Sequence, residues 1–358
     1  MPVRLWLGAP PFRTAHRFDC LRTTLGASAR NVAASRKDLN SITPPATRRL
    51  PDAATASRFR SDATRPSVAA CWWLAMRPKT LTVSAAPVIV GSAVAWSQTQ
   101  SLLLLPALVA LLAAMLIQIG TNLHNDVADF ERGADTPERI GPPRATAMGW
   151  LSPVAVRRGA WLAFALAFNF GVYLVWHSGW PIVVIGLASL FAGWAYTGGP
   201  RPIAYSPFGE LFVWIFFGVV AVGGSYYLQT YSFDAAVFVA ASMVGLLAAG
   251  VITVNNTRDV DTDARVGKHT LAVAVGRRGA GVVYALEMLV PFALLPLLAV
   301  LLERGWSLAL PLLVLPPVLL QVARFRRETS GPAFNELLAR TAQLQLVFCF
   351  LLAAALAV

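Results

Sequence analysis

The sequence predicts an all-α membrane protein, a polytopic transmembrane helical bundle of about nine helices. Of the 358 residues, 56% are hydrophobic and 13% are charged, whereas a soluble domain carries about 25% charged residues. The apolar residues fall into runs close to the ~20 residues that cross the hydrocarbon core of a bilayer. Open sheets are excluded, because unpaired backbone groups are not tolerated in lipid.

Each apolar segment is close to the length of one transmembrane span, and short polar connections separate most of them. The segments cover residues 80–97, 102–121, 159–176, 180–197, 208–228, 234–254, 281–302, 306–322 and 341–357. Two connections, 121–158 and 255–281, are much longer than the others and hold most of the charge of this region.

The basic residues of the connections predict the orientation of the chain. The connections after the second, fourth, sixth and eighth segments hold five, one, five and four Arg/Lys, whereas Arg304 is alone in the other loops. Because cytoplasmic loops carry an excess of Lys and Arg, both long loops and the N-terminus are predicted to be cytoplasmic. An odd number of spans then places Val358 outside the cell. We expect a bacterial inner (plasma) membrane protein.

Residues 1–68 differ in composition from the rest of the chain. They hold 12 Arg/Lys and four Asp/Glu, and so carry +8 of the net charge of +12. This segment is rich in Arg, Ser, Thr, Ala and Pro and has no run long enough to span a bilayer, which predicts a basic, disordered extension. It is either a transit peptide, which is Arg- and Ser-rich, or an upstream extension, with the functional protein beginning near Ser67. Residues 69–358 form the predicted transmembrane domain.

Because most of the positive charge lies in that extension, the net charge does not indicate a nucleic-acid partner. The lipid bilayer is the partner that the composition predicts.

A first polar motif follows the second apolar segment, with the sequence NDVADFERGAD over residues 125–135. If the helix continues, Asn122, Asn125 or Asp126, and Asp129 are spaced by three, four and seven residues and share one helix face. Asp135 follows shortly after. The motif therefore directs two carboxylates to one place.

A second motif follows the sixth apolar segment, with the sequence NNTRDVDTD over residues 255–263. Asp259 and Asp263 are four residues apart and lie on a common face if the segment is helical. Asn255 precedes them, as Asn122 and Asn125 precede the carboxylates of the first motif.

Carboxylates gathered near a bilayer repel one another, and a divalent cation removes that cost. Oxygen ligands without His or Cys favour Mg²⁺, which is commonly shared with substrate phosphates. Two facing motifs predict a diphosphate site, and basic residues suited to its remaining charge are Lys79, Arg132, Arg139, Arg144, Arg258 and Lys268. The alternative is that both loops are ordinary solvated turns, but two Asn-preceded clusters at cytoplasmic helix ends argue against it.

At these motifs the sequence resembles the UbiA superfamily of membrane-embedded prenyltransferases over roughly residues 72–358. The matching strings are RPKTL (77–81), NDVADFERGADTPERIGPPR (125–144), YTGGPRPIAY (196–205) and NNTRDVDTDARVGKHTLAVAVG (255–276). The resemblance implies a fold of nine helices that binds Mg²⁺ and a polyprenyl diphosphate. It makes Asp126, Asp129, Asp259 and Asp263 the metal-binding catalytic residues, with Asp135 as an additional ligand. The substrate-binding residues it implies are Lys79, Asn122, Asn125, Arg139, Arg144, Tyr196, Asn255, Arg258 and Lys268.

The first motif is similar to the branch that prenylates 1,4-dihydroxy-2-naphthoate in menaquinone synthesis. The ubiquinone branch typically has an acidic residue at the position of Gly133. We therefore expect an aromatic acid acceptor, 1,4-dihydroxy-2-naphthoate, and loss of CO₂. Two alternatives remain: another acceptor, such as 4-hydroxybenzoate, homogentisate or a porphyrin, or a secondary transporter, which would place acidic residues in the middle of spans.

Overall fold

The computed structural model describes residues 66–135 and 139–358, and every regular element in these ranges is a helix. In chain order they are α3 (Val68–Met76), α4 (Pro78–Thr99), α5 (Leu104–Glu131), α6 (Pro153–Ser178), α7 (Trp180–Ala195), η1 (Ile203–Tyr205), α8 (Gly209–Val213), η2 (Trp214–Val220), α9 (Ala221–Thr230), α10 (Ala235–Arg258), α11 (Val260–Arg265), α12 (Leu271–Leu301), η3 (Trp306–Val314), α13 (Leu315–Arg327) and α14 (Ala333–Ala357). The all-α prediction is confirmed. The extension predicted over residues 1–68 lies outside the described residues except for its last three.

Eight helical stretches in the described part of the chain are long and apolar enough to cross a membrane. α8, η2 and α9 run on as one of these spans, and η3 and α13 form another. The remaining apolar segment is α7, whose 16 residues extend about 24 Å at 1.5 Å per residue, less than the ~30 Å hydrocarbon core. The predicted count of about nine spans therefore corresponds to eight full spans and one short helix, and the protein is an integral membrane protein.

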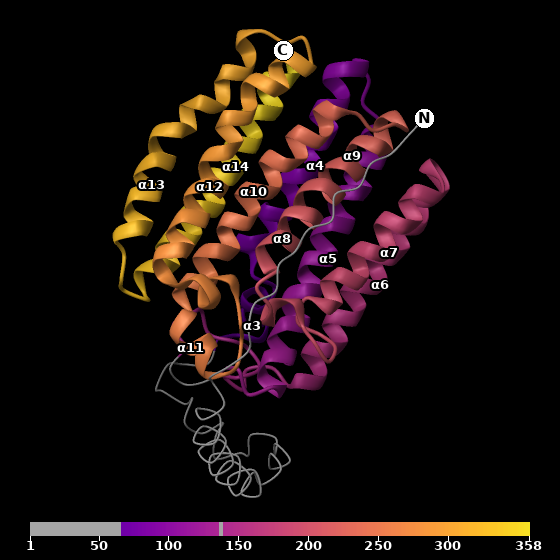
Figure 1. Cartoon of the computed structure of the whole chain (residues 1–358). Helices are drawn as coiled ribbons and strands as arrows, with labels where there is room; N and C mark the ends of the chain where they lie inside the picture. The colour runs from indigo at the N-terminus through magenta and orange to yellow at the C-terminus, as the bar shows by residue number, and fades with distance from the viewer. Residues whose placement is uncertain (1–65, 136–138) are drawn as a thin grey trace, which may run out of the picture. The chain divides into compact units, whose positions relative to one another are not determined.

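The long helices lie side by side, with α10 packed against α4, η2, α12 and α14 (Figure 1). α10 is the central helix, because 67% of its most apolar window is buried, more than in any other of the eight spans. The loops after α5 and α10 emerge at the same end of the bundle, and the C-terminus lies at the opposite end. This agrees with the prediction that both long loops share one membrane face.

Several helices extend farther at that end than hydropathy predicts. α5 continues to Glu131 instead of ending near residue 121. α14 begins at Ala333, before its predicted start at 341. Hydropathy detects only the part of a helix that lies in hydrocarbon, and polar helix ends project beyond it. The first motif is consequently carried by a helix, and the side chains of its two aspartates have fixed directions.

The span that contains η2 approaches α10 at the level of the backbone. A Cβ atom at Gly218 would lie 2.5 Å from the carbonyl oxygen of Ala241, so only glycine fits this crossing. Small residues at helix contacts are typical of membrane bundles. η2 itself is π-helical, and π-helical segments are frequent at functional sites. Here Phe216 and Phe217 of η2 line the cavity described next.

Candidate active site

A cavity of about 270 Å³ lies between α4, α5, α7, η2 and α10, at the end of the bundle that carries the two motifs. Its lining changes along each helix. On α5 it passes from Ala114 and Ile117 to Asn125 and Asp129, and on α10 it passes from Ala248 to the polar residues of the second motif. The cavity therefore joins a polar end to an apolar interior.

Most of the residues predicted from the sequence line this cavity: Asn122, Asn125, Asp129, Arg139, Arg144, Tyr196, Asn255, Asp259, Asp263 and Lys268. They come from α5, α10, α11 and three loops, so the fold brings together segments far apart in the sequence. Lys79, Asp126, Asp135 and Arg258 are absent from the lining.

Asp129 is the most heavily contacted carboxylate at the polar end. It is 2% exposed. Its Oδ2 accepts a hydrogen bond from Arg144 at 3.0 Å, and its Oδ1 lies 3.4 Å from the Lys268 ammonium and accepts a hydrogen bond from the Tyr205 hydroxyl at 3.1 Å. Two cations and a phenol therefore fix this carboxylate at the cavity wall.

Lys268 connects the two motifs. Its ammonium lies 3.4 Å from Asp129 of the first motif and 4.0 Å from Asp263 of the second. The same ammonium stands 4.7 Å from the centre of the Tyr205 ring, a cation–π distance. The two Asp-rich motifs thus face each other across one lysine.

The two motifs also end in the same way. Gly133, with φ of +66°, follows α5, and Gly267, with φ of +76°, follows α11. In each case the residue after the glycine donates its backbone N–H to the carbonyl of the aspartate five positions earlier, Asp129 or Asp263. Such left-handed C-caps favour glycine. Gly133 is exposed, and no described residue lies within 4 Å of a built Cβ, so its role in the fold is to end the helix.

Asp126 has a different environment from Asp129. It is 1% exposed, and its two oxygens accept hydrogen bonds from the backbone N–H groups of Ala145 and Thr146 at 3.1 and 3.0 Å. Asp126 shares a broad helix face with Asp129, but these two N–H groups occupy both of its oxygens, and it is absent from the cavity lining. The structure does not bring it to the cavity. It holds the turn that follows Arg144.

Three other predicted residues also lie off the cavity lining. Lys79 is exposed to solvent. Arg258 is buried and forms a bidentate pair with Asp259. Asp135 is buried and pairs with Arg139 at 2.8 Å and with Arg144 at 3.6 Å. Arg258 and Asp135 therefore act on residues that line the cavity.

Two residues that the prediction did not single out belong to the site. Arg77 lies between α3 and α4 with φ of 54°, and it lines the cavity in place of Lys79. Tyr205 contacts the first motif and the loop that follows the second, since its hydroxyl donates to Asp129 and its carbonyl accepts from the His269 N–H at 3.0 Å. Arg77 is part of the string RPKTL and Tyr205 is part of YTGGPRPIAY. Both strings resemble the family, and this resemblance was the sequence signal that could have identified the two residues.

Three arginines at the polar end hold buried N–H groups that have no hydrogen-bond partner among the described residues. They are Nη2 of Arg77, Nε of Arg139 and Nη1 of Arg144. A buried donor left unpaired costs free energy, and guanidinium groups pair well with phosphate oxygens. These donors fit an anionic ligand with several acceptor oxygens.

The sequence profile of the UbiA prenyltransferase family matches residues 84–357. The chain belongs to the UbiA prenyltransferase family. Among its relatives, a 1,4-dihydroxy-2-naphthoate octaprenyltransferase of Haemophilus influenzae is 35% identical over 254 residues, which cover 68% of this chain and 82% of that protein. The enzyme of the same name from Escherichia coli is 36% identical over 280 residues, covering 75% of this chain and 89% of that protein.

Solved structures of UbiA proteins have the same fold. A UbiA homolog from Archaeoglobus fulgidus, bound to DMAPP and Mg²⁺, matches with a TM-score of 0.56 at 14% identity, covering 79% of this chain and 99% of that one. A UbiA homolog from Aeropyrum pernix matches with a TM-score of 0.57 at 18% identity, covering 76% of this chain and 96% of that one.

The donor set of this UbiA protein fits a metal that is shared with a substrate. Within residues 66–135 and 139–358, no three His, Cys, Asp or Glu side chains are close enough to hold a metal ion by themselves. Asp129, Asp259, Asp263 and Asn125 supply oxygen atoms from two sides of the cavity. Mg²⁺ is usually bound by one or two carboxylates together with substrate phosphates, so these residues would suit a divalent metal that a diphosphate substrate also binds.

The site carboxylates predict a pH dependence. Burial raises the pKa of Asp135 to about 7, although Arg139 opposes the shift, and burial raises the pKa of Asp263 to about 6 against Lys268. Because both pKa values lie above the ordinary value of 3.8, ionisation of these groups lowers the stability of the metal-free fold as the pH rises from about 4 to about 7. A divalent cation requires the ionised carboxylates, so Mg²⁺ should raise the melting temperature more at pH 8 than at pH 6. Thermal unfolding in detergent with and without Mg²⁺ measures this, and an equal increase at both pH values would contradict it.

Proposed function

We propose that this UbiA protein transfers a polyprenyl group from a polyprenyl diphosphate to 1,4-dihydroxy-2-naphthoate, with loss of CO₂, in a Mg²⁺-dependent step of menaquinone synthesis. The observation that carries the proposal is the cavity, in which two facing aspartate motifs and unpaired arginine donors adjoin an apolar interior. The acceptor is supported by relatives of that name at 35% and 36% identity over most of their length.

The diphosphate of the donor belongs at the polar end of the cavity. Arg77, Arg139 and Arg144 each offer a buried N–H that no other residue in 66–135 or 139–358 accepts, and Lys268 adds an ammonium beside Asp129. Charge-assisted hydrogen bonds from such groups to phosphate oxygens are strong. The prenyl chain then follows the lining of α5 and α10 into the apolar interior.

Mg²⁺ would be held by Asp129, Asp259 and Asp263, with Asn125 as a further oxygen donor, and Asp126 supports them through the turn after Arg144. When bound, the metal neutralises charge on the diphosphate and so makes it a better leaving group. Mg²⁺ is present in the Archaeoglobus homolog of the same fold.

The transfer breaks the bond between the allylic carbon and the diphosphate oxygen, and the diphosphate keeps the electron pair. The arginines and Lys268 stabilise the negative charge that develops there. The apolar lining, including Phe216 and Phe217, keeps water from the allylic cation. The aromatic ring attacks this cation at the carbon that carries the carboxylate. Loss of CO₂ then restores the aromatic ring, so no protein base is needed.

Tyr196 also lines the cavity. Burial raises the pKa of its phenol above the ordinary value, and the charge of Glu210 adds to the shift. The phenol therefore stays neutral and is able to donate a hydrogen bond to a substrate oxygen.

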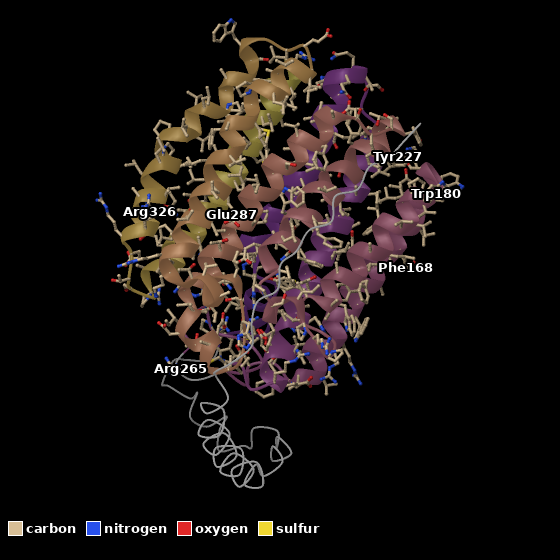
Figure 2. All side chains as sticks on the ribbon, in the orientation of Figure 1. Phe168, Trp180, Tyr227, Arg265, Glu287 and Arg326 are labelled. Atoms are coloured by element: carbon tan, nitrogen blue, oxygen red, sulfur yellow. The ribbon has the colours of Figure 1, made fainter. Side chains whose placement is uncertain are left out.

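The position of the motif aspartates favours an enzyme over the alternative transporter. The two aspartate pairs lie at helix ends. Glu287, labelled in Figure 2, is buried within α12, and its carboxylate accepts a hydrogen bond from Thr253 of α10 at 2.6 Å. This contact joins two helices inside the bundle, as polar side chains do in membrane proteins.

The remaining expectations concern placement. The positive-inside pattern supports an active site that faces the cytoplasm in a bacterial inner membrane. Residues 69–358 are proposed to form the catalytic domain, and residues 1–68 are proposed to be dispensable for the reaction.

A carboxylate-labelled acceptor tests the function. The purified protein, with a polyprenyl diphosphate and Mg²⁺, should prenylate 1,4-dihydroxy-2-naphthoate in preference to 4-hydroxybenzoate and release labelled CO₂ in step with product. The bicyclic ring offers more apolar surface, and burial contributes about 25 cal/mol per Å², enough for a preference of about ten- to a hundredfold. A product that keeps the label, or a higher kcat/KM for 4-hydroxybenzoate, would refute the acceptor but leave prenyl transfer intact.

A further inference from the structure

Arg258 connects the second motif to the last helix. Its side chain is 2% exposed, and its Nε and Nη2 donate to the two oxygens of Asp259 at 2.8 and 2.6 Å. Nη2 also donates to the Asn255 Oδ1 at 2.9 Å, and Nη1 donates to the Asn335 Oδ1 at 2.9 Å. The guanidinium therefore fixes the direction of the Asp259 carboxylate, and Asn335 in turn fixes the guanidinium.

Asn335 also holds the segment that follows the first motif. This residue lies in the first turn of α14, and its Nδ2 donates to the carbonyl oxygen of Ile140 at 3.2 Å. Next to this bond the Ile140 side chain packs on Gly331, where a Cβ atom would lie 2.5 Å from it. Ile140 directly follows Arg139, which lines the cavity.

One amide side chain thus contacts both halves of the site. Its oxygen accepts from the arginine that orients Asp259, and its nitrogen donates to the segment that carries Arg139. A side-chain amide offers a donor and an acceptor on separate atoms without a charge. Asn335 of α14, which is far from both motifs in sequence, therefore sets the distance between the Asp259 carboxylate and Arg139.

We propose that Asn335 is a positioning residue, which aligns Asp259 and Arg139 for one metal-bound diphosphate. The inference rests on the proposed function. Without the amide, the Nη1 of Arg258 is left buried and unpaired, the guanidinium shifts, and the Asp259 carboxylate shifts with it. Small displacements of groups that hold a substrate have large effects on catalysis.

Asn335→Leu tests the proposal, because leucine has a similar volume and no hydrogen-bonding group. We expect about a tenfold rise in the Mg²⁺ concentration for half-maximal activity and in the KM for the prenyl diphosphate, the scale of one lost hydrogen bond to a charged group. The KM for the aromatic acceptor should be unchanged. The matched control is Glu336→Gln on the same turn, whose exposed carboxylate pairs with Arg324 and Arg340, and it should behave like the wild type.

A second measurement does not depend on turnover. Mg²⁺ with inorganic diphosphate should raise the melting temperature of the wild type and of Glu336→Gln, and the same shift should require about tenfold more Mg²⁺ in Asn335→Leu. Asn335→Asp keeps an acceptor for Arg258 but loses the donor to Ile140. Its Mg²⁺ requirement should therefore lie between those of the wild type and Asn335→Leu. This variant tests the proposal if the leucine variant does not fold.

A folded Asn335→Leu protein with the wild-type requirement for Mg²⁺ would overturn the proposal. The proposal would also fail if the variant had a lower melting temperature and all its kinetic constants, including the KM for the aromatic acceptor, changed by the same factor. If the wild type transfers no prenyl group, the proposed function fails. In that case the melting temperatures with Mg²⁺ and inorganic diphosphate still show whether Asn335 positions the binding site, because they do not depend on turnover. Failure of the proposed function is therefore distinguishable from failure of the positioning role.

Discussion

Asp129→Asn is expected to lower the rate of prenyl transfer by at least ~10²-fold, the scale of losing one main electrostatic stabiliser. The substitution keeps the volume of the side chain but removes the charge that faces Arg144 and Lys268 at 3.0 and 3.4 Å. It also places a neutral amide where Arg144 and the Tyr205 hydroxyl donate, so both lose a charged acceptor. The rate of product formation in detergent, at saturating concentrations of both substrates, measures the effect.

Asp261→Asn is the matched control for this variant. Asp261 lies in the second motif, but its side chain is 73% exposed and pairs with Arg277 at 3.0 Å. Because exposed ion pairs contribute about 0–1 kcal/mol, we expect the same melting temperature within a few degrees and nearly full activity. Near-normal turnover of Asp129→Asn, or an equal loss in both variants, would contradict the assignment of Asp129 to the reacting site.

Removal of divalent cations is expected to abolish prenyl transfer, with a loss of at least ~10²-fold. The polar end of the cavity gathers Asp129, Asp259 and Asp263, and a diphosphate placed beside them without a cation would meet strong repulsion. Mg²⁺ should restore the rate, whereas Ca²⁺ should restore it poorly, because Ca²⁺ prefers more ligands at longer distances.

The experiment treats the detergent-solubilised protein with excess EDTA and then adds each cation back. The melting temperature in EDTA serves as the control that the bundle remains folded, since its stability comes from the packing of α10 with its neighbours. Full activity in excess EDTA would exclude a metal-dependent reaction for this protein.

Much of the fold could be predicted from the sequence, because span length and polar helix ends are local properties of the chain. Hydropathy located every span but misplaced several ends, and α12 shows why. It begins at Leu271, ten residues before the predicted start at 281, and bends at Gly276, where φ is 68°. The first ten residues of α12 precede the apolar run, so a hydropathy profile does not detect them as part of the helix.

The candidate site was predictable only in part. The spacing of four between Asp259 and Asp263, and the helical continuation through Asp129, gave the correct residues for the cavity wall. Spacing alone did not separate Asp129 from Asp126, because both are compatible with one broad helix face. The backbone N–H groups of Ala145 and Thr146 distinguish them, since they bind both oxygens of Asp126.

The sequence by itself determined the membrane-spanning helices, the end of the bundle that is polar and the two aspartate pairs, because each depends on residues within one or two helical turns. Tertiary structure alone decided the contacts among distant segments. Tyr205 reaches Asp129 across 76 positions, and Lys268 reaches it across 139. Arg77 and Asn335 join the site in the same way, through the packing of α4 and α14 against the motifs. Such contacts depend on how whole helices pack, and the local spacing of residues does not determine which of them form.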